Sequence, residues 1–121
     1  MSETRVLETF QPEEQALLRQ AVEVICSVAQ QHGVEVVQIY LFGSRARGEG
    51  EEESDWDFYV VTSEPMTRAQ QRLILQEAKR VLAKMHLPND ILLERYAQFE
   101  KFKQLVGHIA YEVGQEGVRL L

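Results

Sequence analysis

The sequence has few of the features that identify secreted or membrane-spanning proteins. Its single cysteine, Cys26, permits no internal disulfide and fits a reducing compartment. No stretch approaches the ~20 consecutive apolar residues that a helix needs to cross a bilayer. The N-terminus carries no basic segment followed by an apolar one, so we expect no secretory signal. These absences predict a soluble protein of the cytoplasm.

Positive charge is also scarce. The 121 residues include 13 Lys and Arg against 19 Asp and Glu, for a formal net charge of −6. A general nucleic-acid binder needs a basic face to displace counterions, so this balance argues against that class. With 45% hydrophobic and 26% charged residues the chain is neither disordered nor fibrous. Its length suits one domain spanning residues 1–121.

Aspartate is the scarcest charged residue. Only three of the 19 acidic residues are aspartates, Asp55, Asp57 and Asp90, and the others are glutamates. Glutamate disperses readily over solvated surfaces, and we expect the acidic run at 49–53 to point into water. The few aspartates are therefore the first residues to consider for a site.

Hydrophobic periodicity predicts helices and strands in alternation. Apolar residues at spacings of three and four indicate helices, and β-branched or alternating apolar residues indicate strands. A capping box at Thr67 and Gln70 begins the second helix, and Gly107 is a candidate break in the last. The expected elements are helix 12–33, strand 34–42, loop 43–54, strand 55–62, helix 67–87, strand 89–96 and helix 98–116. This α/β-type order predicts an α+β fold, a small sheet whose helices cover one face and leave the other accessible.

Asp55 and Asp57 form a paired-carboxylate pattern on the strand at 55–62. Alternate residues of a strand share a face, so these side chains lie about 6.5–7 Å apart along the backbone. Two like charges this close repel unless a cation lies between them, and Mg²⁺ prefers a few hard carboxylate oxygens. Asp90, on the next strand, is the candidate third carboxylate of a two-metal site. Such a site can activate an attacking hydroxyl and neutralise a leaving pyrophosphate.

Gly43 and Ser44 stand where the first strand ends. A glycine there lets backbone amides approach a phosphate, and the serine hydroxyl adds a donor. Ten residues separate Ser44 from Asp55. A phosphate cradle and a metal-binding strand in this order, between two predicted strands, form a specific signal.

The run from Phe42 to Gly48, this ten-residue spacing and the sequence Ser54-Asp55-Trp56-Asp57 resemble the signature of minimal nucleotidyltransferases of the DNA polymerase β superfamily. The resemblance implies a nucleotidyltransferase fold, with a small mixed sheet, helices packed mainly on one face and a closing helix and strand. It also implies that Gly43 and Ser44 hold the β- and γ-phosphates, and that Asp55 and Asp57 bind Mg²⁺. Asp90 would orient or deprotonate the acceptor hydroxyl.

Short members of this family are commonly antitoxins paired with a HEPN-domain toxin, and several transfer AMP from ATP to a toxin tyrosine. The resemblance therefore implies a Mg²⁺-dependent adenylyltransferase with two metal ions, ATP as substrate and a HEPN-type toxin as partner, in a homo- or hetero-oligomer. One alternative is a non-catalytic antitoxin, a binding module with the same fold. Another is a small-molecule nucleotidyltransferase that modifies an antibiotic, although such enzymes carry an extra helical domain.

Some assignments stay open at this point. Arg45 and Arg47 are candidate nucleotide-binding residues, but they fit a surface or partner-facing role equally well. Asp90 follows Asn89 rather than an apolar residue, so Glu94, farther along the same predicted strand, is a weaker substitute for the third carboxylate. Cys26 falls on the buried stripe of the first helix, which predicts core packing and not nucleophilic chemistry.

Overall fold

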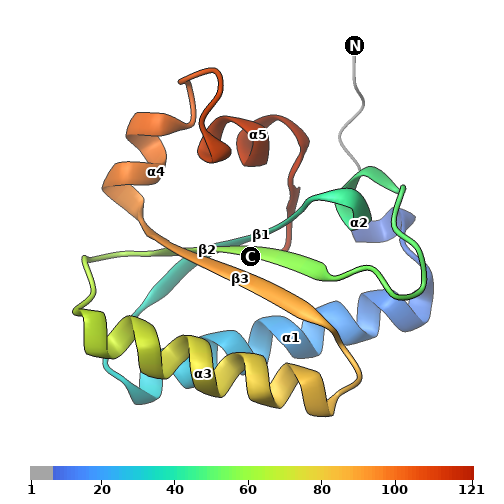
Figure 1. Ribbon diagram of the computed structural model, residues 1–121, viewed down its shortest axis with the longest axis horizontal. Coiled ribbons are helices and arrows are strands. Elements are labelled where there is room, and N and C mark those ends of the chain that lie inside the picture. The colour runs from blue at the N-terminus through green and yellow to red at the C-terminus, as the bar shows by residue number, and fades with distance from the viewer. Residues whose placement is uncertain (1–6) are drawn as a thin grey trace.

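The computed structural model describes residues 7–121 and has the order of elements that the hydrophobic periodicity predicts, with three further short elements (Figure 1). A short 3₁₀ helix precedes the first helix, a one-turn helix follows β1, and a short strand closes the chain. The elements are η1 (Leu7–Thr9), α1 (Pro12–Gln31), β1 (Val36–Phe42), α2 (Ser44–Arg47), β2 (Trp56–Thr62), α3 (Arg68–Lys84), β3 (Asn89–Arg95), α4 (Tyr96–Phe102), α5 (Ile109–Glu116) and β4 (Val118–Arg119).

The four strands form one mixed sheet in the order β3-β2-β1-β4. β1 pairs antiparallel with both β2 and β4, whereas β2 and β3 run parallel. The parallel pair needs a crossover, which α3 supplies, and the capping box predicted at Thr67 and Gln70 begins that helix. A mixed α/β architecture is thus confirmed, and β4 corresponds to the closing strand that the resemblance implied.

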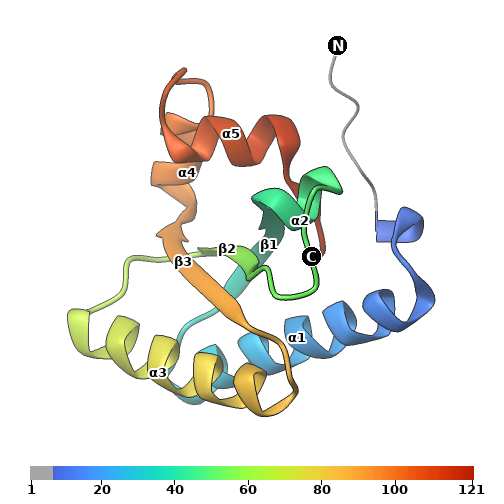
Figure 2. The same cartoon turned by 45° about the vertical axis from the view of Figure 1, so that its right-hand side comes forward.

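The two long helices, α1 and α3, lie side by side against one face of the sheet (Figures 1 and 2). The alternation predicted for β2 is correct, because Trp56, Phe58 and Val60 are buried with these helices in the larger core cluster. Burial on this face fixes the strand register, since a slip of one residue would turn every side chain to the opposite face. The charged residue Asp57 is thereby directed to the other face.

That second face is not left open, contrary to the simple expectation from the sequence. The predicted helix at 98–116 divides at Gly107 (φ 94°), and its halves, α4 and α5, fold back over the sheet (Figure 2). Phe99 of α4 and Val113 of α5 pack there against Tyr59 and Val61 in a smaller cluster. The helices still lie mainly on one face, because α4 and α5 are only 7 and 8 residues long. No helix within residues 7–121 is long and apolar enough to cross a membrane.

Candidate functional site

Gly43 joins β1 to the one-turn helix α2, which occupies part of the predicted loop at 43–54. Its backbone (φ 77°, ψ −161°) lies in a region that is essentially restricted to glycine. A Cβ atom at this position would collide with Oδ2 of Asp57. The missing side chain therefore lets the Asp57 carboxylate lie against the backbone that leads into Ser44. This contact brings together the two halves of the motif, the Gly-Ser turn and the Asp-containing strand.

Asp57 and Asp90 lie opposite each other on the parallel strands β2 and β3. Asp55 precedes Asp57 by two residues and is exposed, just before β2 begins at Trp56, so the predicted strand at 55–62 begins one residue later than expected. Burial, together with repulsion from Asp90 and then Asp55, raises the pKa of Asp57 above its ordinary value of 3.8, while Arg47 opposes the rise. Asp90 and Asp55 are thus close enough to act on Asp57 electrostatically, and their joint role in a metal site stays a prediction.

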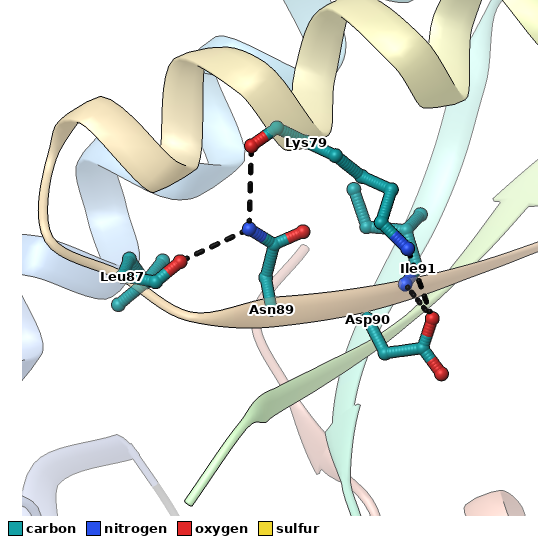
Figure 3. A network of polar contacts seen from close by, with 5 residues as sticks. All are labelled: Lys79, Leu87, Asn89, Asp90 and Ile91. Carbon is teal, nitrogen blue, oxygen red and sulfur yellow. Dashed lines mark hydrogen bonds and ion pairs between the residues drawn. The ribbon is translucent and has the colours of Figure 1, made fainter. Parts of the chain in front are cut away.

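The Asp90 carboxylate is already engaged by neighbouring groups (Figure 3). Lys79 Nζ on α3 donates to its Oδ1 at 3.2 Å, and the backbone N–H of Ile91 donates to the same oxygen at 3.1 Å. Asn89 bonds the carbonyl oxygens of Leu87 and, at 3.4 Å, Lys79, which ties the end of α3 to the start of β3. Sequence reasoning missed Lys79, since helical periodicity does not say which polar residue reaches a strand edge.

The aspartate carboxylates suit Mg²⁺, but fewer than three of them are grouped at one point. In residues 7–121 no group of three or more His, Cys, Asp or Glu side chains is arranged to hold a metal ion. Asp57, next to the glycine cradle, and the nearby Asp55 remain as a pair of hard oxygen donors. Mg²⁺ commonly takes one or two carboxylates and completes its shell with water and substrate phosphate. The chemistry of these residues is therefore compatible with that ion.

Arg45 holds the acidic loop in place. Its Nε and Nη2 donate to the carbonyl oxygen of Ser54 at 3.1 and 2.9 Å, and Nη2 also donates to that of Glu52. The guanidinium stacks over the Trp56 ring, 4.3 Å from its centroid. Arg45 therefore fixes the loop that connects α2 to β2, and nucleotide binding by this residue stays a prediction.

Arg47 lies at the end of α2 and faces α5. Its guanidinium contacts Glu49 at 3.1 Å, and Glu112 and Glu116 of α5 at 3.6 and 3.8 Å. These partners raise the pKa of Arg47, mainly through the hydrogen bond to Glu49. The contacts link the Gly-Ser turn to the C-terminal helix, and a role in binding nucleotide stays a prediction here as well.

Glu94, the weaker substitute for Asp90, lies opposite Val61 and not near the other carboxylates. That is four residues along β2 from Asp57, or about 13 Å at the rise of a strand. Its Oε1 accepts a hydrogen bond from the backbone N–H of Arg95. Glu94 instead lines a hollow of about 470 Å³ at the far end of β3, with Arg95, Gln98 and Lys101 among its walls.

Comparison with known proteins gives a family and several similar structures. The family model described as "Polymerase beta, Nucleotidyltransferase" matches residues 23–121. A structure of a proposed minimal nucleotidyltransferase has 26% identity and a TM-score of 0.54, covering 94% of this chain and 95% of its own. No curated protein matches the sequence.

Two structures of toxin–antitoxin systems share the fold at lower identity. One is a mutant of the toxin–antitoxin MntA–HpeT, with 13% identity and a TM-score of 0.58 over 86% of this chain and 72% of the other. The second is a toxin–antitoxin with AMP-PNP, with 17% identity and a TM-score of 0.55 over 82% and 71% of the two chains.

Proposed function

This chain belongs to the polymerase β family of nucleotidyltransferases, and we propose that it transfers AMP from Mg·ATP to a protein hydroxyl. The observation that carries the proposal is the contact between the two halves of the motif. Asp57 lies in the space that a side chain at Gly43 would fill, so the carboxylates adjoin the turn where phosphates would bind. A phosphate cradle next to a cation site is the arrangement that a triphosphate requires.

Each group in the site has a role in this proposal. The backbone amides that follow Gly43 and the hydroxyl of Ser44 bind the β- and γ-phosphates. Asp55 and Asp57 hold Mg²⁺, which neutralises the charge that develops on the leaving pyrophosphate. Asp90 accepts the hydrogen bond of the acceptor hydroxyl and orients its oxygen towards the α-phosphorus.

The transfer itself forms one bond and breaks another. The acceptor oxygen bonds to the α-phosphorus, the bond from that phosphorus to the bridging oxygen of the β-phosphate breaks, and pyrophosphate leaves with the electron pair. The hydroxyl proton passes to Asp90 or through it to water. Phosphoryl chemistry of this kind needs positioning and charge neutralisation more than covalent help from the protein.

The acceptor in this proposal is a tyrosine of a HEPN-type toxin, and the chain acts as its antitoxin. Two structures that share the fold are toxin–antitoxin systems, and one of them is with AMP-PNP. These likenesses support the choice of a toxin as acceptor and of an adenine nucleotide as donor.

The experiment incubates the protein with Mg²⁺, the product of the adjacent reading frame, and ATP labelled at either the α- or the γ-phosphate. We expect label on the partner from α-labelled ATP only, and weaker label from α-labelled GTP, CTP or UTP. The control is the double variant Asp55→Asn/Asp57→Asn. Absence of label on any protein, or equal labelling by the double variant, would reject catalysis and leave a non-catalytic antitoxin that acts by contact alone.

A further inference from the structure

We infer that Lys79 takes the place of a second metal ion, so that the site binds one divalent cation instead of two. The inference rests on the proposed function, because it concerns how many ions the same carboxylates hold. Lys79 is a positioning residue in this account. It acts through Asp90 and does not touch the nucleotide.

The contact crosses from one layer of the molecule to the other. α3 lies on the side of β3 opposite the Asp90 carboxylate, and the Lys79 side chain reaches down to the strand, across which it contacts that carboxylate (Figure 3). The ammonium nitrogen lies 3.2 Å from Oδ1 of Asp90. This contact is available only because β3 is the edge strand of the sheet, so no neighbouring strand blocks the approach.

Two donors converge on one oxygen of Asp90. The N–H of Ile91, the next residue, bonds the same Oδ1 that Lys79 contacts. Although its backbone is level with Asp57, Oδ1 of Asp90 is thus already occupied by an ammonium group and an N–H of the protein itself. This placement agrees with the finding that no three acidic side chains in residues 7–121 are grouped for a metal.

Charge balance leads to the same conclusion. Three carboxylates carry a formal charge of −3, which one divalent cation and one ammonium group neutralise. Like charges on Asp55, Asp57 and Asp90 repel one another unless cations compensate them. Without Lys79, the Asp90 carboxylate would face Asp57 with no cation beside it, and a second divalent ion would be the natural replacement.

The test counts bound Mn²⁺, used alone as the probe, by electron paramagnetic resonance of the free ion. We expect wild-type protein to saturate near one ion per chain and Lys79→Met to bind a second. Lys79→Arg keeps the positive charge and should stay near one ion. Adding Asp90→Asn to Lys79→Met should return the count to one, because the carboxylate that would bind the second ion is gone. The Lys79 and Asp90 side chains are 43% and 55% exposed, so we expect all variants to fold, which a thermal melt verifies.

A wild-type count of two, a Lys79→Met count of one, or a second ion in Lys79→Arg would overturn the inference. A second ion that binds to Lys79→Met and is lost again when Asp90→Asn is added would support the inference. A purely structural role of Lys79 does not predict this result. Failure of the proposed function has a different signature, the absence of transferred label from ATP whatever the number of ions bound.

Discussion

Asp57 and Asp90 occupy opposite positions on neighbouring parallel strands, yet their environments differ. Asp57 lies on the central strand β2, where burial and two nearby carboxylates raise its pKa. Asp90 lies on the edge strand β3, half exposed and ion-paired with Lys79. The place of a strand in the sheet thus decides whether a cation of the protein itself can reach the carboxylate. On the central strand Arg47 only partly offsets the rise in the pKa of Asp57, and the proposed function assigns the remaining compensation to a bound ion.

The largest expected difference between the two aspartates is in catalysis. We predict that Asp57→Asn lowers kcat/KM for transfer by about 10³-fold, since it removes a charge that holds the metal against the phosphates. Asp90→Asn should cost less, about 10²-fold, the loss typical of a missing proton acceptor. Initial rates with labelled ATP measure both. Equal losses, or a larger loss for Asp90→Asn, would mean that the central carboxylate is not the main metal ligand.

The next effect concerns the glycine that accommodates Asp57. Gly43→Ala should lower transfer by about 10²-fold, because the new Cβ displaces the carboxylate from its position. The substitution should also destabilise the fold by about 1–3 kcal/mol, the usual cost of such a backbone conformation. Gly107→Ala is the matched control, since Gly107 also has a positive φ (94°) but a Cβ there meets no atom within 4 Å. We expect Gly107→Ala to lose stability and keep its transfer rate. A parallel loss of transfer in both variants would contradict the role given to the contact.

Stability in the absence of metal should change in opposite directions at the two positions. Because burial and repulsion raise the pKa of Asp57, its ionised form destabilises the fold once the pH rises through that pKa. Asp57→Asn should therefore raise Tm at pH 7 by about 2 °C, a modest effect because the carboxyl is only part-buried and screened by water. Well below pH 3.8, where the carboxyl is largely protonated in both folded and unfolded chains, the difference should disappear.

Asp90→Asn removes an exposed ion pair, so it should lower the free energy of unfolding at pH 7 by about 0.2–1 kcal/mol. Thermal melts of both variants in EDTA, from pH 3 to 8, test the contrast. A lower Tm for Asp57→Asn at pH 7 would show that its charge does not strain the metal-free fold.

The smallest expected effect concerns a second polar group on β2 that is buried without a partner in the described part of the chain, as the Asp57 carboxylate is partly buried. Tyr59, two residues on, is 2% exposed, and its hydroxyl has no hydrogen-bond partner within residues 7–121. Tyr59→Phe should therefore stabilise the fold, by up to about 1 kcal/mol. Burial raises the pKa of Tyr59 to about 12, so the wild type should lose stability as the pH rises from 10 to 12, and the variant should not. Urea unfolding at pH 8 and pH 11 compares them, and destabilisation by Tyr59→Phe at pH 8 would point to a partner for the hydroxyl.

The sequence predicts one half of the site better than the other. The alternation of β2 is local information, since Trp56 and Phe58 have to face the core and so direct Asp57 to the opposite side. The ten-residue spacing from Ser44 to Asp55 is likewise a local feature of the sequence. By contrast, the alignment of Asp57 with Asp90 depends on how α3 returns the chain, which no local pattern specifies.

The features that the sequence does not predict are either very short elements or contacts between residues far apart in the chain. α2 spans four residues, too few to show a helical period, so the segment was expected to be a loop. Two contacts depend on tertiary packing, which no local sequence pattern specifies. They are the stacking of Arg45 on Trp56 and the ion pair of Lys79 with Asp90. The folding of α4 and α5 over the second face depends on a turn at Gly107, whose position could be suggested but whose direction could not.

The most direct test of the central claim is a crystal structure of the protein with Mn²⁺ and AMP-PNP, in which anomalous scattering locates the metal. We predict an anomalous peak between the carboxylates of Asp55 and Asp57, with the β- and γ-phosphates at the backbone of Gly43 and Ser44. A nucleotide and metal bound elsewhere, such as in the hollow lined by Glu94 and Arg95, would contradict it.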